Sequence, residues 1–134
     1  MQIRHLALFL LLALPFTFGA CESEAPPSGS ISAEVFLADP PAGALVLDVR
    51  TPEEFAGGHI ESAVNIPHDE LDARLGELGE ETTRPIVVHC ESGRRAAKAE
   101  AVLADAGYSS ILHLEGDMKG WRSEGRPLIR ESVP

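Results

Sequence analysis

Four short apolar runs, separated by segments with helical character, constrain the fold of this chain more than any other feature. The runs are ALVLDV at 44–49, AVNI at 63–66, PIVVHC at 85–90 and SILHL at 110–114. Strands that alternate with helices are typical of a parallel sheet with helices on its faces. Nearly continuous apolar runs also fit strands that are buried on both sides. The sequence therefore predicts an α/β fold with a central, mostly parallel sheet and helices on both faces.

Two of the connections carry clear helix signals. After the first run, Thr51 can cap a helix, Pro52 suits the first helical position and Glu54 completes a capping box. After the third run, the segment 93–107 places alanine, valine and leucine on one face at helical spacing and ends in a glycine. This second helix begins immediately after the cysteine that ends the third run.

The first twenty residues predict an export signal that is not part of the fold. Arg4 supplies the positive start, and the apolar stretch LALFLLLAL follows it. That stretch is shorter than the roughly 20 apolar residues that a membrane-spanning helix needs. We expect residues 1–20 to be a signal peptide, residues 21–30 a flexible tether rich in proline, glycine and serine, and residues 31–130 a single domain.

The signal ends in FGAC, which resembles the lipobox of bacterial lipoproteins, in which the cysteine is lipidated and becomes the new N-terminus. The resemblance implies that Cys21 carries lipid. It also implies an exported protein in the periplasm or cell envelope, with this anchor as its only contact with a membrane. Ordinary cleavage is the alternative, and it would leave Cys21 as a spare thiol or remove it.

Charge and cysteine content exclude several classes of function. The chain has 11 Lys and Arg against 21 Asp and Glu, a formal net charge of −10 at pH 7. This charge disfavours nucleic acid and anionic lipid headgroups as partners. Cys21 and Cys90 are the only cysteines, so the chain has no disulfide framework and no C-x-x-C redox or zinc motif. If Cys21 carries lipid, Cys90 is an unpaired thiol that needs another role.

The loop CESGRR at 90–95 offers that role. A cysteine at the end of a strand lies at the carboxyl edge of the sheet, where ligands bind in open α/β folds. Gly93 permits a strained turn whose N–H groups form an anion-binding nest, and the N-terminus of the next helix adds to it. These features favour the thiolate of Cys90 over the thiol. The alternative is that Cys90 is simply a small buried apolar residue.

Two acidic residues and one further arginine near the cysteine complete the candidate site. Asp48 and Arg50 end the first run at the same sheet edge, and they either support the loop electrostatically or form an ion pair that anchors strand to helix. Glu91 opposes thiolate formation and repels a dianionic ligand. The candidate residues are Cys90 as nucleophile, Glu91, Ser92, Gly93, Arg94 and Arg95 as substrate-binding residues, and Asp48 and Arg50 as supporting residues.

Histidine chemistry at the cysteine is not expected. His89 directly precedes the nucleophile, and strand alternation turns its side chain away from the face that Cys90 uses. His59, His68 and His113 show no metal-ligand spacing, so we expect all four histidines to be structural or exposed, and we expect no metal site.

Three motifs, in this order along the chain, resemble the rhodanese-like family of sulfurtransferase domains. LDVRTPEEFAGGHIESAVNIP resembles its first signature, CESGRR its active-site loop Cys-x-x-Gly-x-Arg, and LEGDMKGWRSEGRPL its closing motif. The resemblance covers residues 31 to 128 and implies a rhodanese-like fold with Cys90 as nucleophile and Arg95 as loop arginine. Asp117 departs from the pattern, since the family more often has a second glycine there.

The resemblance also implies a reaction. Cys90 would take sulfane sulfur from a donor such as thiosulfate, hold it as a persulfide and pass it to cyanide or a thiol, without a cofactor. We expect the protein to be a monomer. One alternative is a binding or thiol-sensing module that does not turn over. Another is a phosphatase or arsenate reductase, which needs a cysteine, five residues and an arginine, whereas Ala96 occupies that position here and Arg95 comes one place sooner.

Overall fold

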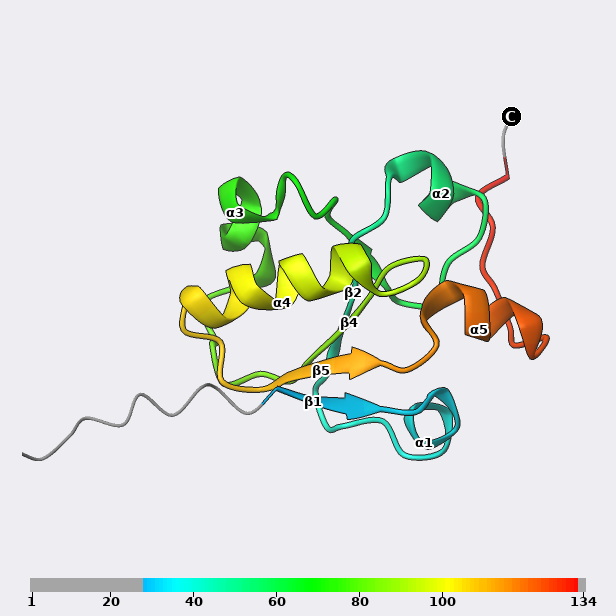
Figure 1. The fold of residues 1–134 in the computed structure, drawn as a ribbon, viewed down its shortest axis with the longest axis horizontal. Helices are drawn as coiled ribbons and strands as arrows, with labels where there is room; N and C mark the ends of the chain where they lie inside the picture. Colours follow the sequence, from blue (N-terminus) through cyan, green and yellow to red (C-terminus); the bar gives the residue numbers. More distant parts are fainter. Residues whose placement is uncertain (1–27, 133–134) are drawn as a thin grey trace, which may run out of the picture.

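The structure, a computed structural model, describes residues 28–132 and consists of one five-stranded sheet with helices on both sides (Figure 1). The elements are β1 (Ser28–Ile31), α1 (Ala33–Ala38), β2 (Leu45–Asp48), α2 (Pro52–Ala56), β3 (Val64–Asn65), α3 (Leu71–Arg74), the 3₁₀ helix η1 (Leu75–Leu78), β4 (Ile86–His89), α4 (Arg94–Asp105), β5 (Ile111–Leu114) and α5 (Asp117–Ser123). The strand order is β1-β5-β4-β2-β3, and every pairing is parallel. The predicted α/β class is confirmed. The expected signal peptide and Cys21 lie outside the described residues.

The central strands are buried on both faces, because successive side chains point to opposite sides of the sheet. In β2, Leu45 and Leu47 join one apolar cluster, whereas Val46 joins the other. In β4, Val88 joins the same cluster as Leu45 and Leu47, whereas Val87 joins the cluster of Val46. This arrangement explains why both strands are continuous apolar runs in the sequence.

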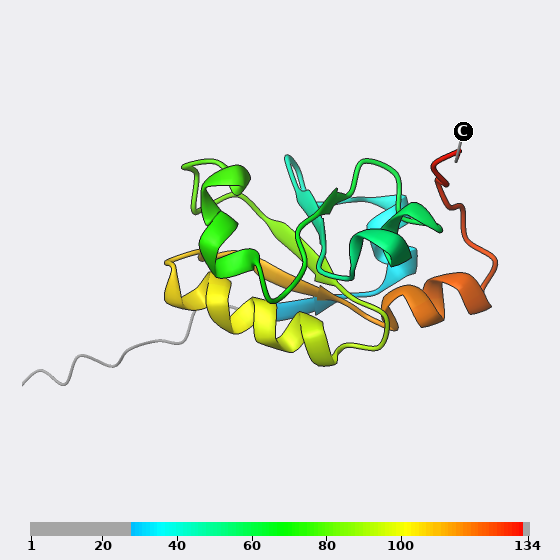
Figure 2. The same ribbon diagram turned by 90° about the horizontal axis from the view of Figure 1, so that it is seen from above.

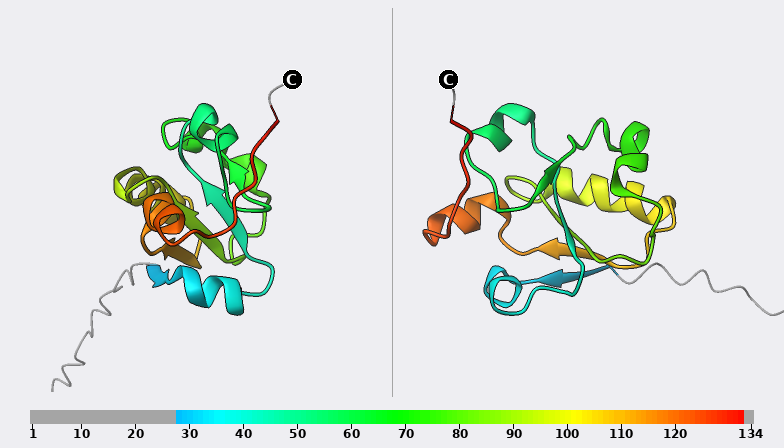
Figure 3. Two further views of the ribbon diagram at one scale, coloured as in Figure 1. Left: turned by 90° about the vertical axis from the view of Figure 1, so that its right-hand side faces the viewer. Right: turned by 180° about the vertical axis from the view of Figure 1, so that it is seen from behind.

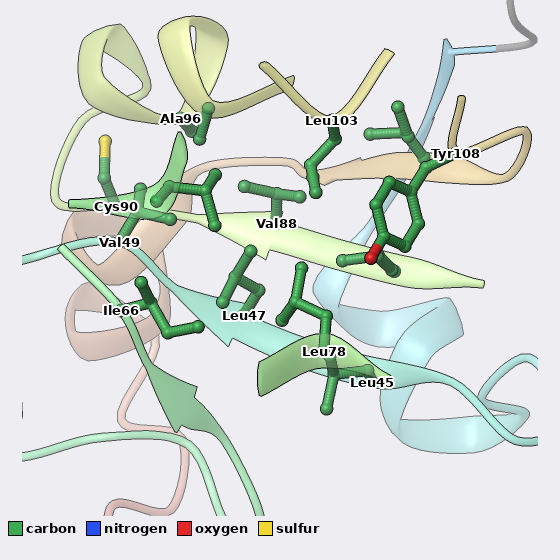
Figure 4. Packing of buried hydrophobic residues seen from close by; sticks show 14 residues of the cluster. Leu45, Leu47, Val49, Ile66, Leu78, Val88, Cys90, Ala96, Leu103 and Tyr108 are labelled. Carbon is green, nitrogen blue, oxygen red and sulfur yellow. The ribbon is translucent and has the colours of Figure 1, made fainter. Parts of the chain in front are cut away.

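The first cluster lies between the sheet and α4, with α3 and η1 beside it (Figure 4). Helix α4 contacts the strands through the small residues Ala96 and Ala99 and through Leu103, all of which are fully buried. Small side chains on the inner face allow the helix to lie close to β4 and β5. The start of α4 is thereby held against the end of β4.

The second cluster lies on the opposite face, under α1 and α5. Trp121 of α5 is 2% exposed, as expected for a core residue, and its indole N–H donates to the carbonyl of Pro127 at 2.8 Å. Phe36 of α1 packs against it with ring centroids 6.4 Å apart. This contact fixes α5 to the body of the domain.

Strand β1 was not predicted. We expect residues 28–30 to belong to the tether, but they pair in parallel with β5, with Ser30 opposite His113. Serine and glycine give no strand signal, so this edge strand depends on backbone hydrogen bonds to β5 and not on side-chain preference.

The carboxyl ends of the strands face α2, α5 and the loop that joins β4 to α4. Figures 1 and 2 show these three segments at one end of the molecule, and Figure 3 shows the chain after α5 running back past α2. There the backbones of His59 and Ile129 exchange two hydrogen bonds of 2.9 Å. None of the helices within residues 28–132 has the length and apolar character to cross a membrane.

Candidate active site

The thiol of Cys90 lies directly after β4, in the loop that leads into α4. The backbone N–H of Gly93 donates to its Sγ at 3.0 Å, and Cys90 is only 1% exposed. Figure 4 shows the sulfur pointing toward the start of α4. A sulfur held by a backbone donor at the start of a helix is placed where negative charge is stabilised.

The turn of the loop depends on Gly93. Its φ of 99° lies in the left-handed region, and it forms the N-cap of α4 without any side-chain cap. The N–H groups of the first turn of α4 therefore have no side-chain acceptor, and such groups bind anions readily. The sequence predicts that the N–H groups of the loop, from Glu91 through Ser92 to Arg95, surround the sulfur. Among them, the Gly93 N–H bonds to it.

The first turn of α5 forms hydrogen bonds with the backbone of the loop. The backbone N–H groups of Met118 and Lys119 donate to the carbonyls of Cys90 and Glu91, each at 3.1 Å. The Asp117 carboxylate accepts the N–H of Cys90 at 2.8 Å through Oδ1. The backbone on either side of the nucleophile is thus fixed by another helix, so the sulfur does not have to be positioned by its own loop alone.

Arg95, predicted to hold an anion, bonds to a carboxylate of the protein. Its guanidinium donates to Glu54 of α2 through Nη1 at 2.7 Å and Nη2 at 2.9 Å. Glu54 also completes the predicted capping box with Thr51. These bonds raise the pKa of Arg95, with Glu54 as the largest cause, so Arg95 stays charged beside the loop. Arg94 is exposed at the start of α4 and makes no ion pair within residues 28–132.

The negative charge of Glu91 is paired with arginines that lie far from it in the sequence. Its carboxylate pairs with Arg122 of α5, and the guanidinium Nη1 of Arg50 lies 3.9 Å from it. Two cations therefore offset the negative charge that the sequence places next to the nucleophile. The ion pairs also tie the loop to α5 and to the end of β2.

Asp48 and Arg50 form an internal ion pair. Both residues are almost fully buried, and Nη2 of Arg50 lies 2.6 Å from Oδ2 of Asp48 and 2.9 Å from the carbonyl of Gly58. The amide of Asn65 donates to the carbonyls of Asp48 and Arg50, each at 3.0 Å. This geometry favours the structural interpretation, in which the pair fastens β2 to the segment after α2. Its contact with Glu91 still links it to the loop.

Two surface hollows flank the loop. One of about 540 Å³ is basic and is lined by Ser92, Arg94, Arg95, Ala97 and Lys98. The other, of about 370 Å³, carries charges of both signs and is lined by Arg50, Glu53, Glu54, Gly57, Gly58, Glu91, Arg122, Leu128 and Arg130. The basic hollow favours anions more than the mixed one does, because its charged lining residues are all cations.

His89 is placed as strand alternation predicts. Its side chain is fully buried, its Nε2 has no hydrogen-bond partner, and Asp48 Oδ2 lies 3.8 Å from that atom. Burial lowers the pKa of His89, so the ring is neutral at pH 7. Within the described part of the chain, no group of three His, Cys, Asp or Glu side chains could hold a metal ion.

Sequence reasoning missed the role of two residues behind the loop. The sequence marks Asp117 only as a departure at a glycine position, and it predicts that His113 is structural or exposed. The structure brings them together, with His113 Nε2 at 3.0 Å from Asp117 Oδ2. The sequence did carry one signal, because Asp117 stands where the family more often has glycine. The structure gives Asp117 a φ of 51°, and a non-glycine residue in that conformation needs a compensating contact.

Comparison with known proteins places this geometry in a family. The model of the rhodanese-like domain matches residues 32–124. A sulfurtransferase of Allochromatium vinosum is 35% identical over 85 residues, which are 63% of this chain and 78% of that protein. The chloroplastic thiosulfate sulfurtransferase 16 of Arabidopsis thaliana is 34% identical over 120 residues, covering 79% of this chain and 95% of the relative.

A solved structure shows the same fold. The rhodanese-related protein of Thermoplasma volcanium superposes with a TM-score of 0.66 at 34% identity, covering 77% of this chain and 99% of that one. Not all relatives are matched so fully, since the chain spans 47% and 60% of the length of two uncharacterized bacterial ones.

Proposed function

Because the chain belongs to the rhodanese-like domain family, we propose that it is a sulfurtransferase that carries sulfane sulfur on Cys90. The observation that carries the proposal is the bond from the Gly93 N–H to Cys90 Sγ, 3.0 Å long, at the uncapped start of α4. Backbone donors already in position can stabilise first the thiolate and then a persulfide anion.

The donor we propose is thiosulfate or a similar anionic sulfane compound. The Cys90 thiolate attacks the outer sulfur, a new S–S bond forms, and the donor's own S–S bond breaks so that sulfite leaves with the electron pair. The positive hollow beside the loop, with Arg94 and Lys98 exposed in it, supports an anionic donor.

The acceptor completes the cycle. Cyanide or a thiolate attacks the terminal sulfur of the persulfide, and the bond to Cys90 Sγ breaks to release thiocyanate or a new persulfide. The Cys90 thiolate is regenerated with its electron pair, so no oxidant, metal or cofactor is needed for the proposed reaction. The Gly93 N–H already faces Sγ, so this donor is in position before the sulfur arrives.

Intact-mass measurement of the purified protein tests this proposal. We expect thiosulfate to add one sulfur atom and cyanide to remove it. Cys90→Ala should gain nothing, whereas Cys21→Ser, which removes the other cysteine, should load normally. No gain in the wild type would contradict sulfur transfer from thiosulfate. Ligand binding that survives in Cys90→Ala without any loading would instead indicate a binding or sensing module.

A further inference from the structure

A chain of hydrogen bonds runs from the surface of α4 to the amide of the nucleophile. Glu100 Oε1 of α4 lies 2.5 Å from Nδ1 of His113 in β5. Nε2 of His113 lies 3.0 Å from Oδ2 of Asp117, and the other oxygen of Asp117 accepts the N–H of Cys90 at 2.8 Å. Two carboxylates therefore enclose one imidazole, and one of them contacts the nucleophile's backbone.

Both ring nitrogens of His113 face carboxylate oxygens, and only the imidazolium can donate from both. Burial by itself lowers the pKa of His113, but the bonds to Glu100 and the charge of Asp117 outweigh it and raise the pKa overall. On the neighbouring strands the residues opposite it in register are uncharged, Ser30 of β1 and Val88 of β4. The carboxylates of Glu100 and Asp117 therefore favour the imidazolium form of His113.

The charge of His113 matters because of where Asp117 lies. A carboxylate on the amide of Cys90 disfavours a negative charge on the sulfur of the same residue. The pair also packs on the back of the loop: a Cβ at Gly93 would lie 3.2 Å from Asp117 Oδ2 and 3.7 Å from His113 Nε2. The imidazolium is thus close enough to cancel the charge of Asp117 at the loop.

We propose that Glu100, His113 and Asp117 are positioning residues for the nucleophile. Asp117 fixes the amide of Cys90, His113 neutralises Asp117, and Glu100 holds His113 in place. The inference rests on the proposed function only in taking Cys90 as the reacting group, because it concerns the reactivity of the thiol and not the identity of the donor. It follows that loss of the His113 charge should make Cys90 less reactive, and loss of the Asp117 charge should undo that effect.

Alkylation of Cys90 by iodoacetamide, followed at neutral pH by peptide mass spectrometry of the full chain, measures this directly. We expect His113→Gln to slow alkylation about threefold or more, since two carboxylates then lie behind the loop without a cation. His113→Gln combined with Asp117→Asn should recover the wild-type rate. His113→Gln combined with Asp105→Asn, which removes an equal charge from the exposed end of α4, should stay slow.

Asp117→Asn alone keeps an acceptor for the Cys90 amide, and we expect it to alkylate at least as fast as the wild type. A slower Asp117→Asn, a His113→Gln that alkylates at the wild-type rate, or a double variant with Asp117→Asn that stays slow would overturn the proposal. The test needs no sulfur transfer. If the variants rank as expected and the wild type accepts no sulfur from thiosulfate, the proposed function fails and the positioning role stands.

Discussion

The guanidinium of Arg95 and the carboxylate of Glu54 meet in a two-pronged ion pair across 41 residues of sequence, with N···O distances of 2.7 and 2.9 Å. This pair joins the first turn of α4 to α2, and it lies beside the turn that holds Cys90. Arg95 therefore supports the loop through Glu54 as well as through its own charge. Such bidentate pairs, with two parallel N–H···O bonds, are the strongest arginine–carboxylate contacts.

Glu54→Gln should destabilise the protein in a pH-dependent way. Hydrogen bonds from Arg95, and then from Thr51, lower the pKa of Glu54 to about 2 against the opposing effect of burial. Because this folded-state pKa lies below the ordinary value of 4.5 that the carboxyl has in the unfolded chain, the stabilisation is fully present above pH 4.5 and is lost as the pH falls toward about 2. The Glu54 side chain is 34% exposed, so after solvent screening we expect about 1 kcal/mol at neutral pH.

Urea denaturation of wild type and variant across this pH range checks the prediction. The difference in free energy of unfolding should shrink as the pH falls, and Glu53→Gln, at an exposed neighbouring carboxylate, should show little difference at any pH. If the difference in free energy of unfolding between wild type and Glu54→Gln stays constant as the pH falls toward about 2, the charge of Glu54 contributes nothing to stability.

Glu91→Gln should improve the use of an anionic donor. It removes the negative charge next to the nucleophile and frees Arg122 and Arg50 from their contacts with it. We expect KM for thiosulfate to fall about threefold, with the gain diminishing at high salt as the charges are screened. Glu124→Gln, which removes another arginine-paired glutamate at the end of α5, is the matched control and should leave KM unchanged.

Gly93→Ala should abolish sulfur loading, whereas Gly43→Ala should not. Both glycines have positive φ, 99° and 70°, so each substitution should cost roughly 1–2 kcal/mol of stability. Only at Gly93 would the new Cβ meet a neighbour, Asp117 Oδ2 at 3.2 Å, whereas it would meet nothing within 4 Å at Gly43. Thermal unfolding of both variants measures the loss of stability from the strained backbone. Intact mass after thiosulfate measures sulfur loading, which only the Cβ contact at Gly93 should prevent. Equal loading by both would show that the turn tolerates a side chain.

Cys21 should carry the membrane anchor proposed from FGAC. Cells grown with a labelled fatty acid should yield labelled wild-type protein in the membrane fraction. Cys21→Ser should be unlabelled and should leave that fraction, because a lipidated cysteine is the attachment that the motif implies. Ordinary signal cleavage would be indicated by an unlabelled wild type.

Most of the sheet could be predicted because burial on both faces leaves a direct mark on the sequence. The strands β2, β4 and β5 fall inside the predicted apolar runs, and α4 begins where the cysteine loop requires it. β1 left no such mark, since its serine and glycine residues become a strand only when β5 offers a backbone to pair with. Edge pairing is a property of the assembled sheet.

The sequence alone determined the α/β fold, the place of Cys90 at a strand end, and the glycine turn that aims an N–H at its sulfur. Which charges surround that sulfur depends on how the helices pack on the sheet. Arg95 with Glu54, Glu91 with Arg122, and Asp117 with the amide of Cys90 are pairs separated by 41, 31 and 27 residues. Local patterns set backbone conformation, but the energy of a charge depends on its distance to others, and packing of helices on the sheet sets that distance.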